Sequence, residues 1–183
     1  MEENTSLGLV EVSEIAGGVL TLDEMCKAAD IVCEMAHHIS RGKYIIIVSG
    51  SVGEVESALM RAKEVSADKI IKSFIIRNVH GHVTKALNKR IKPGKFEAIG
   101  VVETRNALSA VYLADIASKA ASIEMVEIKT GQGIGGKGYF TISGEVGAVK
   151  TAVGAACLAV EDDEIVSRIV IPRAHKNVAK FVF

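Results

Sequence analysis

Short apolar runs and amphipathic stretches alternate along the chain. The runs LGLVEVS (7–13), KYIIIVSG (43–50) and KIIKSFIIRN (69–78) are rich in β-branched residues, which is typical of strands. The stretches IAGGVLTLDEMCKAADI (15–31) and SVGEVESALMRAKEVSA (51–67) carry apolar residues at helical spacing. This half of the chain is therefore predicted to contain at least three strands and two helices.

The ends and faces of these helices can also be predicted. Ser51 is a suitable N-cap for the second helix, because acidic residues follow it in the first turn. A short closing helix is expected within HGHVTKALNKR (80–90). The apolar face of the first helix consists of Val19, Leu22, Met25, Cys26 and Ala29. The whole order predicts an α+β fold, a mostly antiparallel sheet flanked by helices.

The second half of the chain repeats the first. Three pairs of segments match: 7–31 with 99–123, 48–59 with 142–153, and 74–83 with 169–178. The alignment places Gly8 on Gly100, Glu11 on Glu103, Lys27 on Lys119 and His80 on His175. We therefore predict two tandem domains, 5–90 and 96–183, of marginal size for folding alone. The join, NKRIKPGKFE (88–97), is basic and contains a Pro-Gly pair, as in an exposed linker.

One stretch of the second half imitates a nucleotide-binding loop. Gly131, Gly133 and Gly136 have the spacing G-x-G-x-x-G, which binds a dinucleotide where it links a strand to a helix. Here GYFTISG (138–144), a predicted strand, follows the glycines, and the next helix does not begin until Glu145. No helix N-terminus faces the loop, so we predict a glycine-rich hairpin loop instead.

The composition narrows the class of protein. Hydrophobic residues make up 49% of the chain with only 4% aromatic, and the mean hydropathy is +0.30. No apolar run approaches the roughly 20 residues of a membrane span, so an oligomer that covers apolar surface is expected. A net charge of zero without a long basic block argues against nucleic acid. The polar start MEENTS and three unpatterned cysteines indicate a cytoplasmic protein.

Several motifs together resemble the bacterial microcompartment shell domain. They are the LGLVEV strand, the D-x-M-x-K-A-A helix, GEVGAVK and VIPRAH. Two copies in the ordinary strand order are similar to the tandem-domain, trimer-forming class of that family. The resemblance implies a structural shell protein and no enzyme: a homotrimer that forms a pseudohexamer, a flat disc around a central pore for metabolites or cofactors. Its partners would be further copies, other shell proteins edge to edge and encapsulated enzymes, with no membrane or nucleic acid, within the shell in the cytoplasm.

The resemblance also assigns residues to the pore and to the disc edge. The implied pore-lining residues are His38, Ile39, Ser40, Arg41 and Gly42 in the first half, and Gly131, Gln132, Gly133, Ile134, Gly135, Gly136 and Lys137 in the second. The implied edge contacts are Lys27, Asn78, Lys119 and Arg173. Because Asn78 stands where the second half has Arg173, the six edges of such a disc would not be equivalent.

Ser40 departs from one member of that class, in which a cysteine at this place binds an iron–sulfur cluster. Serine is a much weaker ligand than a thiolate, so we expect no metal and no cofactor. The alternative is a redox conduit with a metal or iron–sulfur centre in the pore. Arg41 and Lys43 either attract anionic metabolites there or point into water.

Other candidate sites are weak. Cys33, His37 and His38 are too few for a structural zinc site, so a core thiol and histidines at the surface or pore rim are expected. His80, which recurs as His175, is predicted to cap a helix. No nucleophile–base or paired-carboxylate arrangement indicates an enzyme. A small-molecule regulator or nucleotide enzyme using the glycine loop is the remaining alternative.

Overall fold

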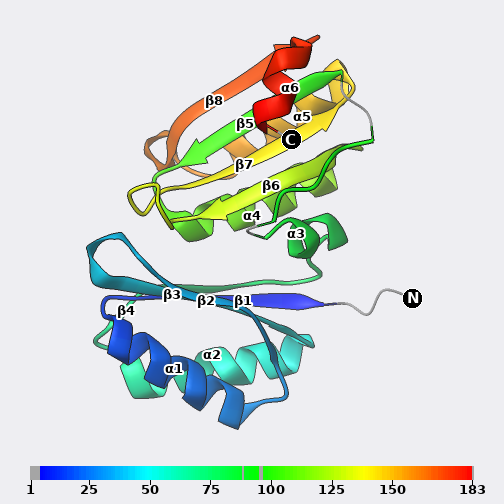
Figure 1. The fold of residues 1–183 in the computed structure, drawn as a ribbon. Helices are drawn as coiled ribbons and strands as arrows, with labels where there is room; N and C mark the ends of the chain where they lie inside the picture. Colours follow the sequence, from blue (N-terminus) through cyan, green and yellow to red (C-terminus); the bar gives the residue numbers. More distant parts are fainter. Residues whose placement is uncertain (1–4, 88, 95–96, 183) are drawn as a thin grey trace. The chain divides into compact units, whose positions relative to one another are not determined.

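The chain folds into two compact units, Met1–Val79 and His80–Phe183, in this computed structural model (Figure 1). The structure describes residues 5–87, 89–94 and 97–182, without the side chains of 179–181. Residues 88, 95 and 96 of the predicted linker, and the predicted domain ends at 96 and 183, lie outside the described residues.

The four strands and the two long helices follow one another in the same order in both units. The first unit contains β1 (Ser6–Val12), α1 (Ile15–Ala28), β2 (Val32–Ile39), the 3₁₀ turn Ser40–Gly42, β3 (Lys43–Gly50), α2 (Val52–Ser66) and β4 (Ile70–Ile76). The second contains α3 (Gly81–Ala86), β5 (Ala98–Thr104), α4 (Ala107–Ala120), β6 (Glu124–Thr130), β7 (Gly138–Gly144), α5 (Val146–Leu158), the 3₁₀ turn Asp162–Glu164, β8 (Ile165–Pro172) and α6 (Lys176–Val182). None of the described helices is long and apolar enough to cross a membrane.

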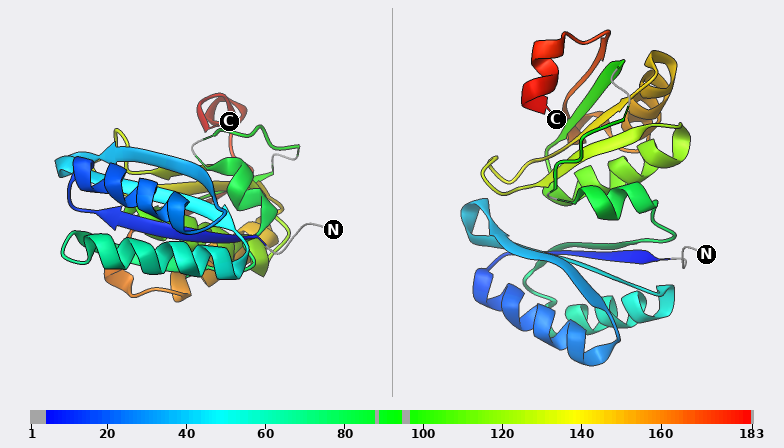
Figure 2. Two further views of the ribbon diagram at one scale, coloured as in Figure 1. Left: turned by 90° about the horizontal axis from the view of Figure 1, so that it is seen from below. Right: turned by 45° about the vertical axis from the view of Figure 1, so that its right-hand side comes forward.

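Each unit is built on one four-stranded antiparallel sheet. The strand orders are β2-β3-β1-β4 and β6-β7-β5-β8, so the second sheet repeats the first. Helices α1 and α2 lie on one face of the first sheet, and α4 and α5 lie on one face of the second (Figures 1 and 2). The predicted α+β fold and the predicted duplication are both confirmed.

The central strands show how closely the repeats agree. A Cβ atom added at Gly8 of β1 would lie 2.9 Å from Cγ1 of Val55, and one added at Gly100 of β5 would lie 2.8 Å from Cγ1 of Val149. Val149 is the counterpart of Val55 in the alignment. In both units, therefore, the second helix packs directly on the backbone of the central strand, and only glycine leaves room for it.

The predicted face of α1 is only partly correct. The buried residues are Gly17, Gly18, Thr21 and Met25, whereas Val19 is 53% exposed and Cys26 is exposed. The helix packs through its small residues because they allow close approach, and the hydroxyls of Thr21 and Ser66 join α1 to α2 at 2.7 Å.

The predicted cap of α2 is confirmed. The Ser51 hydroxyl accepts a hydrogen bond from the Glu54 backbone N–H, and the Glu54 carboxylate accepts one from the Ser51 N–H. This capping box satisfies two N–H groups that the first turn leaves unpaired.

Helix α1 packs on β3 in the first unit, and α4 packs on β7 in the second. The glycine of this contact lies on the helix in the first unit and on the strand in the second. A Cβ atom on Gly18 would lie 2.5 Å from the Tyr44 side chain. In the second unit the counterparts are Ala110 and Gly138, and a Cβ atom on Gly138 would lie 2.6 Å from the Ala110 Cβ. One residue of each pair is glycine, so the size of each residue limits the size of its partner.

We therefore expect Gly18→Ala to lower the free energy of unfolding by about 1–3 kcal/mol through overpacking. In a Tyr44→Gly background the same change should be neutral or stabilise by up to about 1 kcal/mol, because alanine favours the helix. Urea unfolding of the four proteins as a double-mutant cycle measures this coupling. An equal effect of Gly18→Ala in both backgrounds would contradict the pairing.

Candidate functional site

The loop that joins β2 to β3 is a tight turn. Ile39 pairs with Lys43 across the hairpin, and Ser40, Arg41 and Gly42 connect them. Arg41 and Gly42 both have positive φ, 65° and 72°. Glycine adopts this conformation without cost, whereas arginine does so only under a local constraint. Arg41 lies exposed at the tip of the turn.

The counterpart loop between β6 and β7 is longer. Thr130 pairs with Gly138, and residues 131–137 form the loop. It is closed by hydrogen bonds from Gly131 N–H to the Lys137 carbonyl at 2.8 Å and from Gly136 N–H to the Gly131 carbonyl at 3.3 Å. The positive φ angles fall at Gly131, Gly133, Gly135 and Gly136. The predicted glycine-rich hairpin loop is confirmed, and a strand rather than a helix follows it.

The structure groups the residues assigned to the pore into these two hairpins. Ser40, Arg41 and Gly42 form the first turn, while His38 and Ile39 are the last residues of β2. The Ile39 side chain is only 4% exposed, so it lies in the core of the first unit. The second set, 131–137, coincides with the longer loop. Each set is therefore continuous at one hairpin tip.

The lysines beside these hairpins are ion-paired. The Lys43 ammonium lies 2.7 Å from the carboxylate of Glu11, and the Lys137 ammonium lies 2.8 Å from that of Glu103. The two pairs occupy equivalent positions, but Glu11 is 1% exposed and Glu103 is 34% exposed. Among the described residues of the two hairpins, Arg41 forms no ion pair within 4.0 Å, and neither does Lys129 of β6.

The cysteine and histidine predictions have mixed outcomes. Cys33 is exposed and lies on β2, so the predicted core thiol is wrong; β2 is an edge strand with an open side. Partial burial raises the pKa of this thiol, and the nearby Cys26 raises it further. The predicted cap is confirmed, because Nδ1 of His80 accepts from the His82 N–H and Nδ1 of His175 from the Asn177 N–H. In the described part of the chain, no three His, Cys, Asp or Glu residues are grouped to hold a metal.

The closing helix of the first repeat packs in the second unit. Helix α3 lies against β6: Val83 and Ala86 are fully buried, and Leu87 forms a parallel bridge with Ile128. The start of this helix is held by Asp115 of α4, whose carboxylate accepts a hydrogen bond from the His80 N–H at 2.8 Å.

The linker continues along the same edge. The Ile91 N–H donates to the Val126 carbonyl at 2.7 Å, and the Gly94 N–H donates to the Glu124 carboxylate at 2.6 Å. Most of its described residues are exposed, as predicted, but the sequence did not indicate that the linker covers a strand. The edge of β6 is therefore covered by α3 of the first repeat and by the linker.

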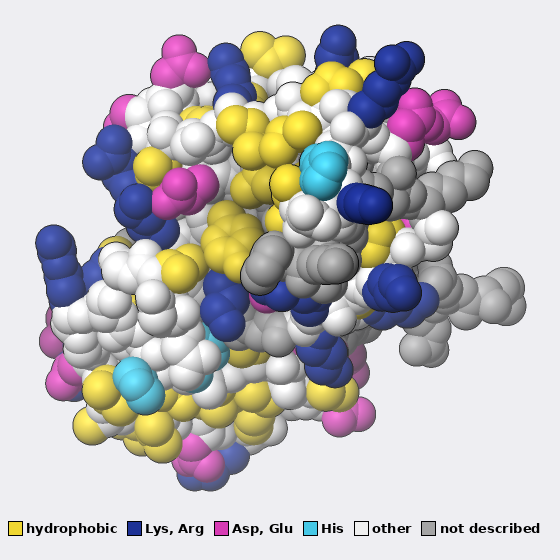
Figure 3. Space-filling model, turned by 45° about the horizontal axis from the view of Figure 1, so that its top comes forward, with side chains coloured by type: hydrophobic (Ala, Val, Ile, Leu, Met, Phe, Trp, Pro, Cys, Tyr) yellow, Lys and Arg dark blue, Asp and Glu magenta, His cyan; other side chains and the backbone are white. Residues whose placement is uncertain are grey.

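The residues equivalent to these buried ones in the other repeat are exposed. Val178 of α6 is 37% exposed, whereas its counterpart Val83 is fully buried. Cys33 is exposed on β2, whereas its counterpart Met125 is 3% exposed. Hydrophobic side chains also reach the surface between charged ones on the face drawn in Figure 3. On α1 and β2, the large hydrophobic residues that are exposed are Ile15, Val19, Leu20 and Val32.

The predicted edge residues occupy matching places in the two units. Lys27 and Lys119 lie in the last turns of α1 and α4, each paired with the aspartate one turn earlier. The hydrogen bond with Asp23 raises the pKa of Lys27. Asn78 and Arg173 share a left-handed backbone, with φ of 52° and 49°, just after β4 and β8. Asparagine tolerates this conformation better than arginine does.

Comparisons with known proteins agree with this architecture. The BMC domain model matches residues 6–79 and 98–174. The chain is 32% identical to the bacterial microcompartment shell protein PduT of Citrobacter freundii over 94% of both chains. A crystal structure of a microcompartment protein from Desulfitobacterium hafniense superposes with a TM-score of 0.91 at 36% identity, covering 97% of this chain and 99% of that one. A double-ringed trimeric shell protein of the RMM microcompartment has the same fold, with a TM-score of 0.63 at 17% identity over 85% of this chain and 81% of that one.

The matched ion pairs give a direct test of how the first hairpin is supported. Lys43→Met removes the ion pair of a buried carboxylate, and we expect it to lower the free energy of unfolding by about 3 kcal/mol. Lys137→Met is the matched control, because its partner is much more exposed and the expected loss is under about 1 kcal/mol. Denaturant unfolding of both variants checks this difference, and equal losses would refute it.

Proposed function

The chain belongs to the BMC-domain family of bacterial microcompartment shell proteins, and we propose that three copies of it form one disc of such a shell with a pore at its centre. The relatives it matches are structural shell proteins rather than enzymes, so it is a structural protein. The remainder of the proposal concerns how the copies meet and what the hairpins do.

The observation that carries the trimer is the mismatch between equivalent surfaces. Helix α3 and the linker close the edge of β6, while the equivalent edge, β2, is open in the same chain. Helix α6 is the counterpart of α3, and its Val178 is exposed. In the proposed trimer, α6 of one copy covers β2 of the next copy. A head-to-tail contact of this kind closes into a ring when the rotation permits.

The burial of the first helices supports the same contact. Ala107 and Val111 of α4 are buried, whereas their counterparts Ile15 and Val19 on α1 are exposed. Asp115 is 4% exposed and receives the His80 N–H, whereas Asp23 is 53% exposed. In the proposed trimer the next copy covers these residues, and the N–H of its His175 donates a hydrogen bond to the Asp23 carboxylate. A solved relative is described as trimeric, which agrees with three copies.

The two hairpins then surround the pore in alternation. Ser40 and Arg41 from the first and the loop 131–137 from the second face the axis. Lys43 and Lys137 contribute little net charge there, because each is paired with a glutamate. A ring of Arg41 side chains favours the passage of small anionic metabolites. Lys27, Asn78, Lys119 and Arg173 meet neighbouring discs, formed by this or other shell proteins, around the encapsulated enzymes.

Sedimentation and thiol labelling test the trimer together. We expect wild-type protein to sediment as a trimer at micromolar concentration and Val178→Asp to weaken association by at least about tenfold, because a charge enters an apolar contact. The control is Leu158→Asp, since Leu158 is 90% exposed and outside the proposed contact.

A maleimide should label Cys26 and Cys33 in the Val178→Asp protein but not in the wild-type trimer. Cys157 is buried and serves as the unreactive internal control. A wild-type monomer, or a Val178→Asp trimer, would refute the proposed contact.

A cysteine at the turn tests the placement of Ser40 at the axis. Ser40→Cys brings three thiolates together at a three-fold axis, and thiolates are the preferred ligands of iron–sulfur clusters. After anaerobic reconstitution we expect a brown, iron-containing trimer, whereas wild-type protein stays colourless. A colourless Ser40→Cys trimer would argue against the axial position, and iron in wild-type protein would support the redox alternative.

A further inference from the structure

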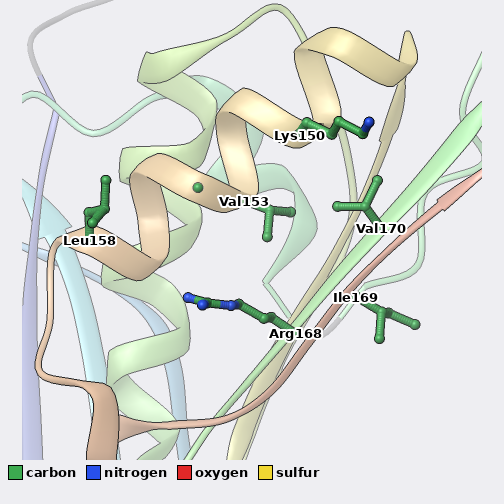
Figure 4. Close-up of a pocket in the computed structure, with 7 residues that line it drawn as sticks. Lys150, Val153, Leu158, Arg168, Ile169 and Val170 are labelled. Atoms are coloured by element: carbon green, nitrogen blue, oxygen red, sulfur yellow. The ribbon is translucent and has the colours of Figure 1, made fainter.

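A surface of the second unit lies outside the hairpins and the assembly contacts described above. A groove of about 400 Å³ runs between α5 and the edge strand β8 (Figure 4). Arg168 and Val170 point from β8 toward the helix, while Ile169 points to the other face of the strand (Figure 4). The helix contributes Lys150, Val153, Gly154 and Leu158. The groove is thus apolar with two cations and no acidic lining residue.

The equivalent groove of the first unit, between α2 and β4, has different chemistry. It has a volume of about 260 Å³ and contains Glu56, Met60 and Ser73 where the second groove has Lys150, Gly154 and Arg168. Glu56 is paired with Arg77 at 2.6 Å. The counterpart of Arg77 is Pro172, so the second unit has lost this pair and gained two cations in its place.

The two cations of the second groove are available to a ligand. Neither Lys150 nor Arg168 forms an ion pair with another described residue within 4.0 Å. The pKa of Arg168 is raised by interaction with the Cys157 side chain and by the charge of Asp162, while Lys150 is exposed. Carboxylates from outside the chain would complement both groups.

Gly154 keeps this groove open. It lies inside α5, and a Cβ atom added there would meet nothing within 4 Å, so packing does not demand glycine. Glycine within a helix costs about 1 kcal/mol relative to alanine. In the first unit, Met60 fills the equivalent position.

Strand β8 offers a backbone beside the groove. Within the described residues it pairs with β5 only, so its outer edge carries unpaired N–H and C=O groups. Val166 and Ile169 are 41% and 46% exposed along it. Small-molecule sites bury most of their ligand, whereas this groove is partly open to solvent, which suits an extended chain.

We propose that this groove binds an extended segment of another protein, which pairs with the free edge of β8. Every second side chain of that segment faces the groove, and these are alternately carboxylate and aliphatic. The carboxylates meet Lys150 and Arg168, and the aliphatic groups pack on Val153 and Leu158. The inference goes beyond the shell role and does not depend on the trimer.

A synthetic peptide of repeated Glu-Thr-Val-Thr, labelled with a fluorophore, is the probe. Fluorescence anisotropy with the full chain should give saturable binding that weakens with salt. We expect Lys150→Glu combined with Arg168→Glu to weaken binding by at least about tenfold. Gly154→Met should do the same by filling the groove without a change of charge, and it fits an open position.

Matched controls separate the groove from general attraction. Lys63→Glu reverses a charge in the equivalent groove of the first unit and should leave binding unchanged. A Lys-Thr-Val-Thr peptide should not bind. No saturable binding, equal loss in Lys63→Glu, or full binding in Gly154→Met would each overturn the proposal.

Sedimentation of every variant distinguishes this proposal from the proposed trimer. We expect all of them to remain trimeric while peptide binding is lost. If Gly154→Met instead reduced self-association, the occupant would be a second copy of this chain, and the proposed partner would be wrong.

Discussion

The edge of an antiparallel sheet is the constraint on which the rest of this structure depends. An edge strand carries unpaired N–H and C=O groups and must be covered, shortened or paired. In the second unit the edge strand β6 is covered by α3, which belongs to the first repeat, and by the linker. In the first unit the equivalent strand β2 is open, with Val32 62% exposed. A repeat that covers its neighbour's edge instead of its own is suited to closed rings.

Duplication allowed the two units to diverge while each kept a packed core. Gly18 with Tyr44 and Ala110 with Gly138 fill the same contact with the bulk on opposite sides. Packing density is what both pairs preserve, because a native core has little free volume to absorb an extra side chain.

Surface positions diverged more freely, and the differences are chemical. The short turn carries Arg41, whereas the long loop 131–137 carries four glycines at positive φ. The groove beside α2 contains Met60 and carries one acidic and one basic residue, Glu56 and Lys63, whereas the groove beside α5 is cationic and has Gly154 in place of Met60. The two repeats of one chain therefore present two different sets of surface groups.

Much of the architecture was determined by the sequence alone. Local patterns, which few residues specify, predicted the Ser51 N-cap, the histidine caps and the hairpin nature of the glycine loop. They also predicted most of the strand and helix order, but they did not assign β2 in the first half. The duplication could be read by aligning the two halves, and it identified the two hairpins as equivalents. The sequence also argued against a dinucleotide site, since the strand after Gly136 removes the helix that such a site requires.

Tertiary structure decided which side of each element is covered. Val19 and Cys26 follow helical spacing, yet α1 packs through Gly17, Gly18 and Thr21, because close approach to the sheet favours small residues. Only the folded chain pairs Lys43 with a buried Glu11, which lies 32 residues away in sequence. Likewise, Asp23 and Asp115 look alike in the sequence, but only Asp115 is buried under a helix start. Burial depends on residues that meet through the fold, and these are distant along the chain.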